Sequence, residues 1–525
     1  MSAGSFVCAA LPAANVHIKN AIKTNPNDID EIKINKFLIE NSNKFLCSLG
    51  VVLLKKGYKV DDSLLGKFDR RFLSKFNNAK YIENCELSID SAGYQIQQGY
   101  LEREEIPKWI DLFYDRFIPE YGHRISKAFM VDIAPGFSFC PYKSFKDIRD
   151  LNVYSYEKTK NYSDVLKDKL IYIHHFRTPN LHNIYREMLF DLDLADGIKN
   201  FATGGLVSFG TFGKDIPPYV MYVVPLLEII HYCLNKKIKK FRFHVLGGAE
   251  WKEMLGHKFF EKHVKEIFDI DLEITFDSST FFKTMCMGRY AFNPTNNRSM
   301  RKMSIRPADL DTILDDNGNR TGITHKERFF ELLNDAVSPY GMTPLSNDDP
   351  MYECSECGTG YDSGFCSASR TCPKCGVMDK ETFPNLIYAY GMLQIFKCFK
   401  MCEEWHSAFV EEVYPDLNRP DKFNSEVQKY LVNLHCTPRP NMMNVSLKAV
   451  SIFNSLNLMN EYKENPEYAL NKCRNLVTRY MSKDEHDILK EDGCVSVFDV
   501  KQEKKVEMEG GLKRVRKPKP DVVTF

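Results

Sequence analysis

The feature that most constrains the fold of this chain is an alternation between short apolar runs and amphipathic segments. The apolar runs, rich in β-branched and aromatic residues, are 46–55, 127–135, 170–176, 201–210, 240–248 and 272–277. Helical spacing is found between several of them, at 104–118, 180–192 and 225–238. Continuous apolar strands that alternate with amphipathic helices are typical of βα units around a parallel sheet. The sequence therefore predicts an α/β fold, either a barrel or a doubly wound sheet.

Polar and small residues at the ends of these runs favour the barrel. They are Asp90, Asp132, His174, His175, Gly204, Gly205, Gly247, Gly248 and Asp277. A (β/α)8 TIM barrel builds its site from groups at the carboxyl ends of successive strands. A doubly wound sheet would concentrate them near one switch point, usually with a glycine fingerprint after an early strand, and no such fingerprint is visible.

A cysteine module indicates a metal site. Cys354 and Cys357 form one Cys-x-x-Cys pair and Cys372 and Cys375 form a second, and a glycine follows each pair. This spacing places four thiolates around a zinc ion, and a site filled by four protein ligands leaves no position for substrate or water. We therefore predict a structural Zn²⁺, with Cys366 as the one substitute ligand.

The domain organisation follows from these patterns. We expect a barrel domain over residues 1–345, a zinc-binding module with the helix after it over 346–410, and a helical extension over 411–525 that ends in a basic tail. After about residue 290 the sequence is polar and rich in turn residues, which predicts loops and a short helix at 326–337.

The net charge and the hydropathy of the sequence limit how the protein could bind a nucleic acid or a membrane. With 71 Lys and Arg against 70 Asp and Glu, the net charge is +1, so any polyanion must be bound by local clusters. One cluster holds Arg289, Arg298, Arg301, Lys302 and Arg306, and a second is the tail 511–520. Taken alone, each basic run is more often a solvated loop or a disordered tail. No apolar run reaches bilayer length and no signal peptide is evident, so we expect no membrane partner and a cytoplasmic protein with reduced thiols.

Several segments, in this order, resemble motifs of the tRNA-guanine transglycosylase superfamily. They are DSAGYQ at 90–95, VDIAPG at 131–136, GGL at 204–206, LGGA at 246–249 and FDSST at 276–280. The cysteine module then falls where that family binds zinc, and NLIYAYGML at 385–393 resembles the helix that follows it. The resemblance covers residues 85–400, and the shared order is more specific than any single motif.

The resemblance implies a base-exchange reaction at C1′ of a nucleotide. By resemblance Asp277 is the nucleophile that holds the sugar covalently, and Asp90 is the general acid and base. Asp132 would accept hydrogen bonds from the N1–H and 2-amino group of guanine, and Tyr94 would stack on the base. The full set of base-binding positions is Tyr94, Gln95, Asp132, His174, His175, Gly204, Gly205, Leu206 and Gly247.

Departures from the family pattern concern the base pocket and the nucleic acid. Ala92 replaces a glycine, the glutamate after GGL is lost, and His174 or His175 stands nearest to a missing glutamine. The proline and arginine after the nucleophile are also lost, and Pro384 lies near where a histidine zinc ligand would be expected. The combination resembles the DNA-modifying branch, the DpdA-type enzymes of bacteriophages and bacterial islands.

We therefore expect exchange of guanine in DNA for a free 7-deazaguanine base such as 7-cyano-7-deazaguanine, on a nucleotide flipped out of the duplex. Companion enzymes that make or modify the 7-deazaguanine are expected partners. One alternative is a transglycosylase that acts on tRNA. Two others are a catalytically silent nucleic-acid-binding subunit, which would not need both Asp90 and Asp277, and a metal-dependent hydrolase, for which only His174 and His175 offer open-site ligands.

Overall fold

The computed structural model describes most of the chain. The described residues are 6–8, 11–41, 44–70, 84–133, 144–175, 179–204, 218–247, 251–278, 290–295, 298–304, 312–314, 319–362, 371–378, 381–434 and 441–478. Gly205, Leu206, Arg289 and Cys366, named above as site residues, lie outside them, and so do Arg306 and the basic tail.

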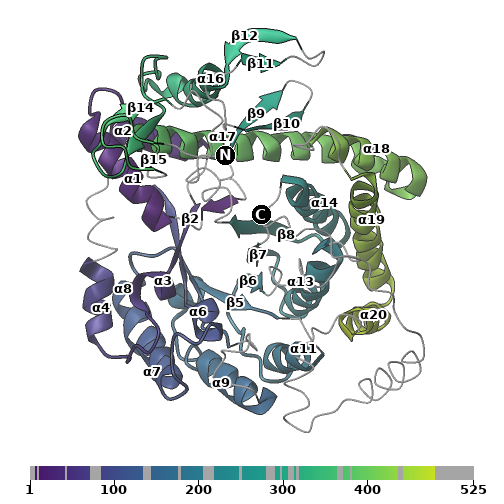
Figure 1. The fold of residues 1–525 in the computed structure, drawn as a ribbon. Helices are drawn as coiled ribbons and strands as arrows, with labels where there is room; N and C mark the ends of the chain where they lie inside the picture. Colours follow the sequence, from purple (N-terminus) through teal and green to yellow (C-terminus); the bar gives the residue numbers. More distant parts are fainter. Residues whose placement is uncertain are drawn as a thin grey trace, which may run out of the picture.

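Eight parallel strands form a closed barrel in which each strand pairs with the next along the chain. The strands are β1 (Phe6–Cys8), β2 (Lys44–Ser48), β3 (Glu86–Asp90), β4 (Lys127–Phe129), β5 (Leu170–Ile173), β6 (Asn200–Thr203), β7 (Lys240–Val245) and β8 (Asp271–Ser278). The sheet closes because β1 pairs with β8, from Phe6 opposite Phe276 to Cys8 opposite Ser278. The α/β barrel expected from the alternation is thus confirmed (Figure 1).

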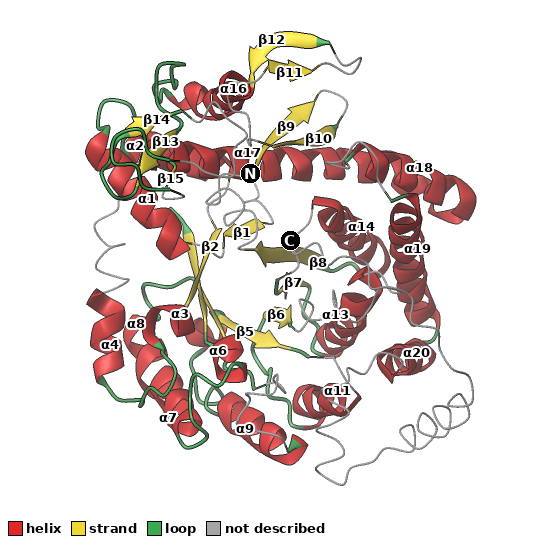
Figure 2. Ribbon diagram, in the orientation of Figure 1, coloured by secondary structure: helices red, strands yellow, loops and turns green. Residues whose placement is uncertain are grey.

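Helices between the strands form the outer layer (Figure 2). They are α1 (Leu11–Thr24), α2 (Glu31–Asn41), α3 (Leu49–Leu53), α4 (Ser63–Phe68), α6 (Gly93–Gln97), α7 (Glu105–Asp111), η3 (Leu112–Phe117), α8 (Ile118–Tyr121), α9 (Phe145–Glu157), α10 (Asp164–Lys167), α11 (Pro179–Arg186), η4 (Glu187–Asp191), α13 (Pro218–Asn235) and α14 (Trp251–Phe268). Local chemistry sets some of these bounds. The Ser144 hydroxyl, for example, accepts a hydrogen bond from the Asp147 N–H and caps α9.

The cysteine module lies within an insertion between β8 and the last helix of the barrel. The insertion contains the hairpins β9 (Tyr290–Thr295) with β10 (Ser299–Ser304) and β11 (Thr312–Leu314) with β12 (Arg320–Thr324), then α16 (His325–Val337), η5 (Ser338–Tyr340) and the small sheet of β13 (Tyr352–Cys354), β14 (Gly360–Tyr361) and β15 (Glu381–Thr382). The long helix α17 (Asn385–Val413) follows and packs against both α1 and α14. It therefore completes the helical ring of the barrel.

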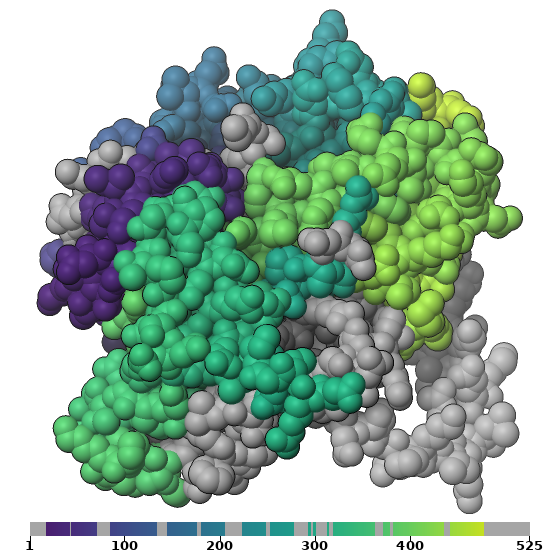
Figure 3. Space-filling view, turned by 90° about the horizontal axis from the view of Figure 1, so that it is seen from above, coloured from purple at the N-terminus to yellow at the C-terminus, as the bar shows by residue number. Residues whose placement is uncertain are grey.

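The C-terminal helices cover the outside of the barrel. After η6 (Tyr414–Asn418), α18 (Pro420–Asn433) turns into α19 (Met442–Glu464), which packs against α13 and α14, and α20 (Pro466–Thr478) packs against α13 and α11. Figure 3 shows the insertion, in green, and these helices, in yellow-green, together on one face of the molecule. No helix in the described part of the chain is both long and apolar enough to cross a membrane.

Side chains inside the barrel form layers. Near the amino ends of the strands lies an ionic layer, in which Lys44 bonds to Glu273 and Arg242 bonds to both Glu86 and Glu273. Above it lies an apolar layer of Leu46, Phe129, Ile171, Ile173 and Ala202. The interior is thus a packed core, and the carboxyl ends of the strands are the open end at which a site can form.

Two local expectations from the sequence are wrong. The apolar run 46–55 is not one strand, because β2 ends at Ser48 and α3 begins at Leu49. The polar stretch after residue 290 is not only loops and one helix, since it also contains the hairpins β9–β10 and β11–β12. The helix expected at 326–337 is present as α16, and Thr324 and Glu327 form a capping box at its start.

Replacing Arg242 with methionine tests whether the ionic layer stabilises the barrel. The change removes the cation that Glu86 and Glu273 share, and losing one partner of a buried ionic network costs about 3 kcal/mol. Glu273 is partly exposed, so water screens some of this cost, and we expect urea denaturation to show a loss of about 2 kcal/mol. Lys262→Met, which removes a surface ion pair with Glu411, should cost less than about 1 kcal/mol. Equal losses in the two variants would contradict this role.

Candidate functional site

Three aspartates meet at the open end of the barrel. Asp90 is the last residue of β3, Asp132 follows β4, and Asp277 is the next-to-last residue of β8. Because the carboxyl ends of parallel strands share one rim, the three carboxyl groups are close enough for the charges of Asp132 and Asp277 to raise the pKa of Asp90. The structure therefore brings together the three aspartates that the sequence singled out.

The carboxyl group of Asp90 has a raised pKa. Burial is the largest cause that raises its pKa, and the negative charges of Asp132 and Asp277 act in the same direction. Hydrogen bonds from Ser48 and from the Ala92 N–H oppose them, and the resulting pKa is about 6. A carboxyl group with this pKa exchanges a proton near neutral pH, which suits a general acid and base.

Asp277 is held through one carboxylate oxygen. The Gly247 N–H donates to Oδ1 at 2.8 Å, and His244 Nε2 lies 3.2 Å from the same oxygen. The carboxylate side chain is 13% exposed, whereas that of His244 is only 3% exposed. The second oxygen, Oδ2, makes no hydrogen bond to a described residue. Two groups therefore hold Oδ1 of Asp277, and Oδ2 has no such partner among the described residues.

Asp132 forms a pair with His175. His175 Nε2 lies 2.7 Å from Asp132 Oδ2. Two glycines allow this packing, because a Cβ on Gly93 would lie 2.2 Å from Asp132 Oδ1 and one on Gly204 would lie 2.6 Å from His175 Cε1. Asp132, His175, Gly93 and Gly204 therefore form one compact wall of the site.

His174 does not join this wall. It follows β5 with the opposite orientation to His175 and is fully buried, with Nε2 at 2.7 Å from Glu228 Oε2. His182 Nε2 lies 2.8 Å from the same oxygen, and Arg186 pairs with the other oxygen of Glu228. Burial raises the pKa of Glu228, but the histidines lower it well below its usual range overall.

His174, His182 and Glu228 also have the ligand types of a metal site. Arg186 already balances the charge of Glu228, so a divalent ion there would add uncompensated charge to a buried region. The contacts of 2.7 and 2.8 Å are ordinary hydrogen-bond distances. We interpret the cluster as a hydrogen-bonded ion pair that fixes α11 and α13 against β5.

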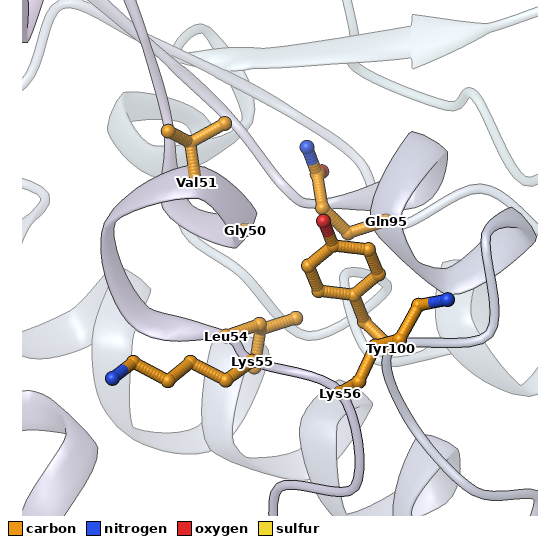
Figure 4. A pocket seen from close by; sticks show the side chains of 7 residues that line it. All are labelled: Gly50, Val51, Leu54, Lys55, Lys56, Gln95 and Tyr100. Atoms are coloured by element: carbon orange, nitrogen blue, oxygen red, sulfur yellow. The ribbon is translucent and has the colours of Figure 1, made fainter.

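A cavity of about 450 Å³ opens beside Gln95 on the same end of the barrel (Figure 4). Its lining residues are Gly50, Val51, Leu54, Lys55, Lys56, Gln95 and Tyr100. The Tyr100 ring lies next to Gln95, and the side chains of Lys55 and Lys56 point away from each other. Asp90, Asp132 and Asp277 do not line this cavity, so it neighbours the aspartates without containing them. Tyr94, on α6, is 60% exposed at this end.

The basic residues expected to bind nucleic acid lie on and beside the β9–β10 hairpin. Arg298 precedes β10 and pairs with Glu412 at the end of α17, with Nη2 at 2.9 Å from Oε1. Arg301 and Lys302 are within β10 and pair in register with Asn293 and Phe292 of β9. β9 is the next described strand in the sequence after β8, which carries Asp277.

The four module cysteines are close together. Sγ of Cys354 lies 3.6 Å from Sγ of Cys375, and Sγ of Cys357 lies 3.6 Å from Sγ of Cys372. Tetrahedral Zn–S bonds of about 2.3 Å would separate the sulfurs by roughly 3.8 Å. The glycine after each pair has a left-handed backbone, at φ 68° for Gly358 and 70° for Gly376. The four sulfurs could therefore hold a metal ion.

Three polar neighbours of the aspartates were not identified from the sequence. Ser48 ends β2 beside Asp90, His244 lies in β7, and Thr275 precedes Asp277 in β8 by two residues. In a strand, residues two apart point to the same side, so Thr275 and Asp277 both face inward. A polar residue two positions before a functional residue at a strand end, as Thr275 is before Asp277, is the signal that could have indicated Thr275.

Comparisons with known proteins add little to this geometry. No protein-family model matches the chain, and no curated protein matches it. A solved structure of a tri-modular endo-β-1,4-glucanase B from Bacillus halodurans is similar at a TM-score of 0.30 and 11% identity, over 48% of this chain and 51% of that chain. The chain thus spans about half the length of that structure. A likeness this weak bears on neither family nor activity.

The raised pKa of Asp90 predicts a dependence of stability on pH. Because the folded state disfavours the ionised carboxylate, the wild type loses stability as the pH rises through about 6, whereas Asp90→Asn does not. The difference in unfolding free energy between the variant and the wild type should therefore grow by roughly 2 to 3 kcal/mol between about pH 4 and about pH 7, measured by urea denaturation.

Asp269→Asn is a control of opposite sign. A hydrogen bond from Lys265 lowers the pKa of Asp269, so this variant should lose stability relative to the wild type as the pH rises from the acid range. A difference for Asp90→Asn that does not change with pH would show that Asp90 titrates as an ordinary carboxyl group.

Proposed function

We propose that this protein is a transglycosylase that exchanges guanine in DNA for a 7-deazaguanine base, such as 7-cyano-7-deazaguanine. The observation that carries the proposal is the pair of unlike aspartates at the barrel mouth. Asp277 is held by two N–H groups through one oxygen, and Asp90 has a pKa of about 6. Two carboxyl groups with different environments can take the separate roles of nucleophile and proton carrier.

The reaction needs both roles. Asp277 attacks C1′ through a lone pair of its second oxygen, the O–C1′ bond forms, and the C1′–N9 bond of deoxyguanosine breaks. The electron pair of that bond leaves with guanine, which takes a proton from neutral Asp90. The incoming base then gives its N9 proton to the Asp90 carboxylate, its nitrogen attacks C1′, and the bond to Asp277 breaks. No oxidant or cofactor is consumed, and the phosphodiester backbone stays intact.

The wall of Asp132 and His175 supports recognition of a guanine-type base. An ionised Asp132 accepts hydrogen bonds from N1–H and the 2-amino group, which guanine and 7-deazaguanines share and adenine lacks. His175 bonds to one oxygen of Asp132 and fixes the orientation of the carboxylate. By the resemblance, Gly205 and Leu206, which lie outside the described residues, are further base-binding positions. The target base must leave the helix to reach the pocket, because C1′ is shielded in a stacked duplex.

Sequence features favour DNA over tRNA as the polymer. The FDSST segment lacks the proline and arginine that the resembled family uses to engage the anticodon loop. The cavity beside Gln95 has apolar walls at Val51 and Leu54 and carries Lys55 and Lys56, which suits a flanking nucleotide with its phosphate. Arg301 and Lys302, with Arg289, Arg298 and the basic tail, would contact phosphates further along the strand.

The direct test is base exchange in a polymer. Purified protein is incubated with 7-cyano-7-deazaguanine and either duplex DNA or bulk tRNA, and the polymer is digested and analysed by mass spectrometry. We expect the modified nucleoside in DNA alone. Asp277→Asn keeps the shape of the side chain but removes the nucleophile, so it should abolish incorporation, and Asp90→Asn should lower the rate by about 100-fold or more.

Each other outcome has a definite meaning. Incorporation into tRNA alone would keep the chemistry and overturn the choice of polymer. Incorporation that persists in Asp277→Asn would exclude a covalent intermediate at that residue. No incorporation in either polymer would contradict the proposal and favour a silent nucleic-acid-binding subunit.

We also propose that the four-cysteine site binds a structural zinc ion. The thiolates of Cys354, Cys357, Cys372 and Cys375 fill all four tetrahedral positions, and the site lies in the insertion, away from the aspartates. Elemental analysis of purified protein should find about one zinc ion per chain, and Cys372→Ala should lose it and lower the melting temperature. Cys473→Ala, at a buried cysteine on α20, is the matched control and should keep the metal.

A further inference from the structure

We propose that His244 and Thr275 are positioning residues for the nucleophile, and that they dedicate Oδ1 of Asp277 to binding and Oδ2 to attack. This inference rests on the proposed function and adds to it the two residues and the assignment of the oxygens. His244 comes from β7 and Thr275 from β8, neighbouring strands on which Thr275 is the register partner of His244. The pair thus belongs to the rigid wall of the barrel and not to a loop.

The hydrogen bonds form a chain with one direction. His244 Nδ1 lies 2.9 Å from Thr275 Oγ, and His244 Nε2 lies 3.2 Å from Asp277 Oδ1. A carboxylate oxygen only accepts, so the Nε2 atom must carry the proton. Nδ1 of a neutral imidazole is then an acceptor, and it takes the hydrogen of the Thr275 hydroxyl. Thr275 therefore selects the tautomer that His244 needs in order to donate to Asp277.

Packing holds the imidazole in this position. The side chains of both His244 and Thr275 are buried, and the Phe129 ring meets the imidazole edge to face with centroids 5.0 Å apart. The Gly247 N–H, 2.8 Å from Oδ1, is a second donor to the same oxygen. With two N–H groups on Oδ1 and none from the described residues on Oδ2, rotation of the carboxylate is restricted. In this proposal the oxygen without a donor, Oδ2, is the one that attacks.

The two donors to Oδ1 act on the steps in which the bond between Asp277 and C1′ forms and breaks. When Oδ2 bonds to C1′, the remaining C=O of the ester is Oδ1, and the two donors stay bound to it. When the incoming base attacks C1′, the bond from C1′ to Asp277 breaks, and its electron pair returns to a carboxylate whose charge these donors stabilise. In this proposal His244 acts on the reaction only through Asp277, so its loss should change turnover and leave substrate affinity alone.

A pair of amide variants tests this role. In His244→Gln the amide nitrogen can occupy the place of Nε2, and in His244→Asn it can occupy only the place of Nδ1. We expect His244→Asn to lower kcat for base exchange by about 100-fold with unchanged KM, and His244→Gln to stay within about fivefold of the wild type. Thermal melting of both variants checks that they are equally folded. Equal losses in the two variants, or a change confined to KM, would overturn the proposal.

Thr275→Val is an independent test of the hydrogen bonds that link Thr275, His244 and Asp277. It preserves the shape of the side chain and removes the hydroxyl that selects the tautomer, so kcat should fall by about tenfold in the wild-type background. In the His244→Gln background the same change should have little effect, because a glutamine has no tautomer to select. Additive losses would show that Thr275 acts without His244 and would contradict the proposal.

Nuclear magnetic resonance separates failure of this inference from failure of the proposed function. In protein labelled with 15N-histidine, the signals that disappear in His244→Gln belong to His244, and we expect them to report the Nε2–H tautomer. An Nε2–H tautomer in a wild type that exchanges no base would overturn the function and leave the hydrogen-bond chain standing. An Nδ1–H tautomer in an active wild type would overturn the proposed hydrogen-bond chain and leave the proposed function standing.

Discussion

Pairing of β1 with β8 closes the sheet, and the other features of the site depend on that closure. In a closed barrel of parallel strands, alternate side chains of every strand must point inward, and all strands end at one rim. The rim therefore collects one inward residue from each strand, whatever the distance between them in the chain. Asp90 and Asp277 are far apart in sequence, yet closure makes the charge of one a cause of the raised pKa of the other.

The same constraint explains why adjacent residues have unrelated roles. His174 and His175 follow one strand, and the alternation sends the first outward to Glu228 and the second inward to Asp132. The sequence could not distinguish them, because both follow an apolar run and both could stand near a missing glutamine. Applying the two-residue period from Ile171 and Ile173, which belong to the apolar layer inside the barrel, would have assigned His175 to the interior.

The alternation of apolar runs predicted a parallel α/β fold, and the polar and small residues at the ends of several runs then favoured a barrel over a doubly wound sheet. It was not enough to predict β1, which has only the residues Phe6–Cys8, or the hairpins after Asp277, where polar residues hide the strand pattern. Those hairpins gain their stability from packing on α16 and α17, which a local pattern does not report. Likewise the aspartates could be found from motifs, whereas the contact between His244 and Thr275 became visible only when β7 and β8 were paired in register.

Ala92 illustrates how a side chain is accommodated at a demanding backbone position. Its backbone is left-handed, at φ 81°, where a residue with a Cβ costs about 1 to 2 kcal/mol relative to glycine. The methyl group is fully buried in the main core, and such burial contributes about 0.8 kcal/mol in the other direction. The net cost is small, so the backbone can keep the path that places Gly93 against Asp132 and the Ala92 N–H on Asp90. At position 93 no such exchange is open, because a methyl group there would occupy the space of the Asp132 carboxylate itself.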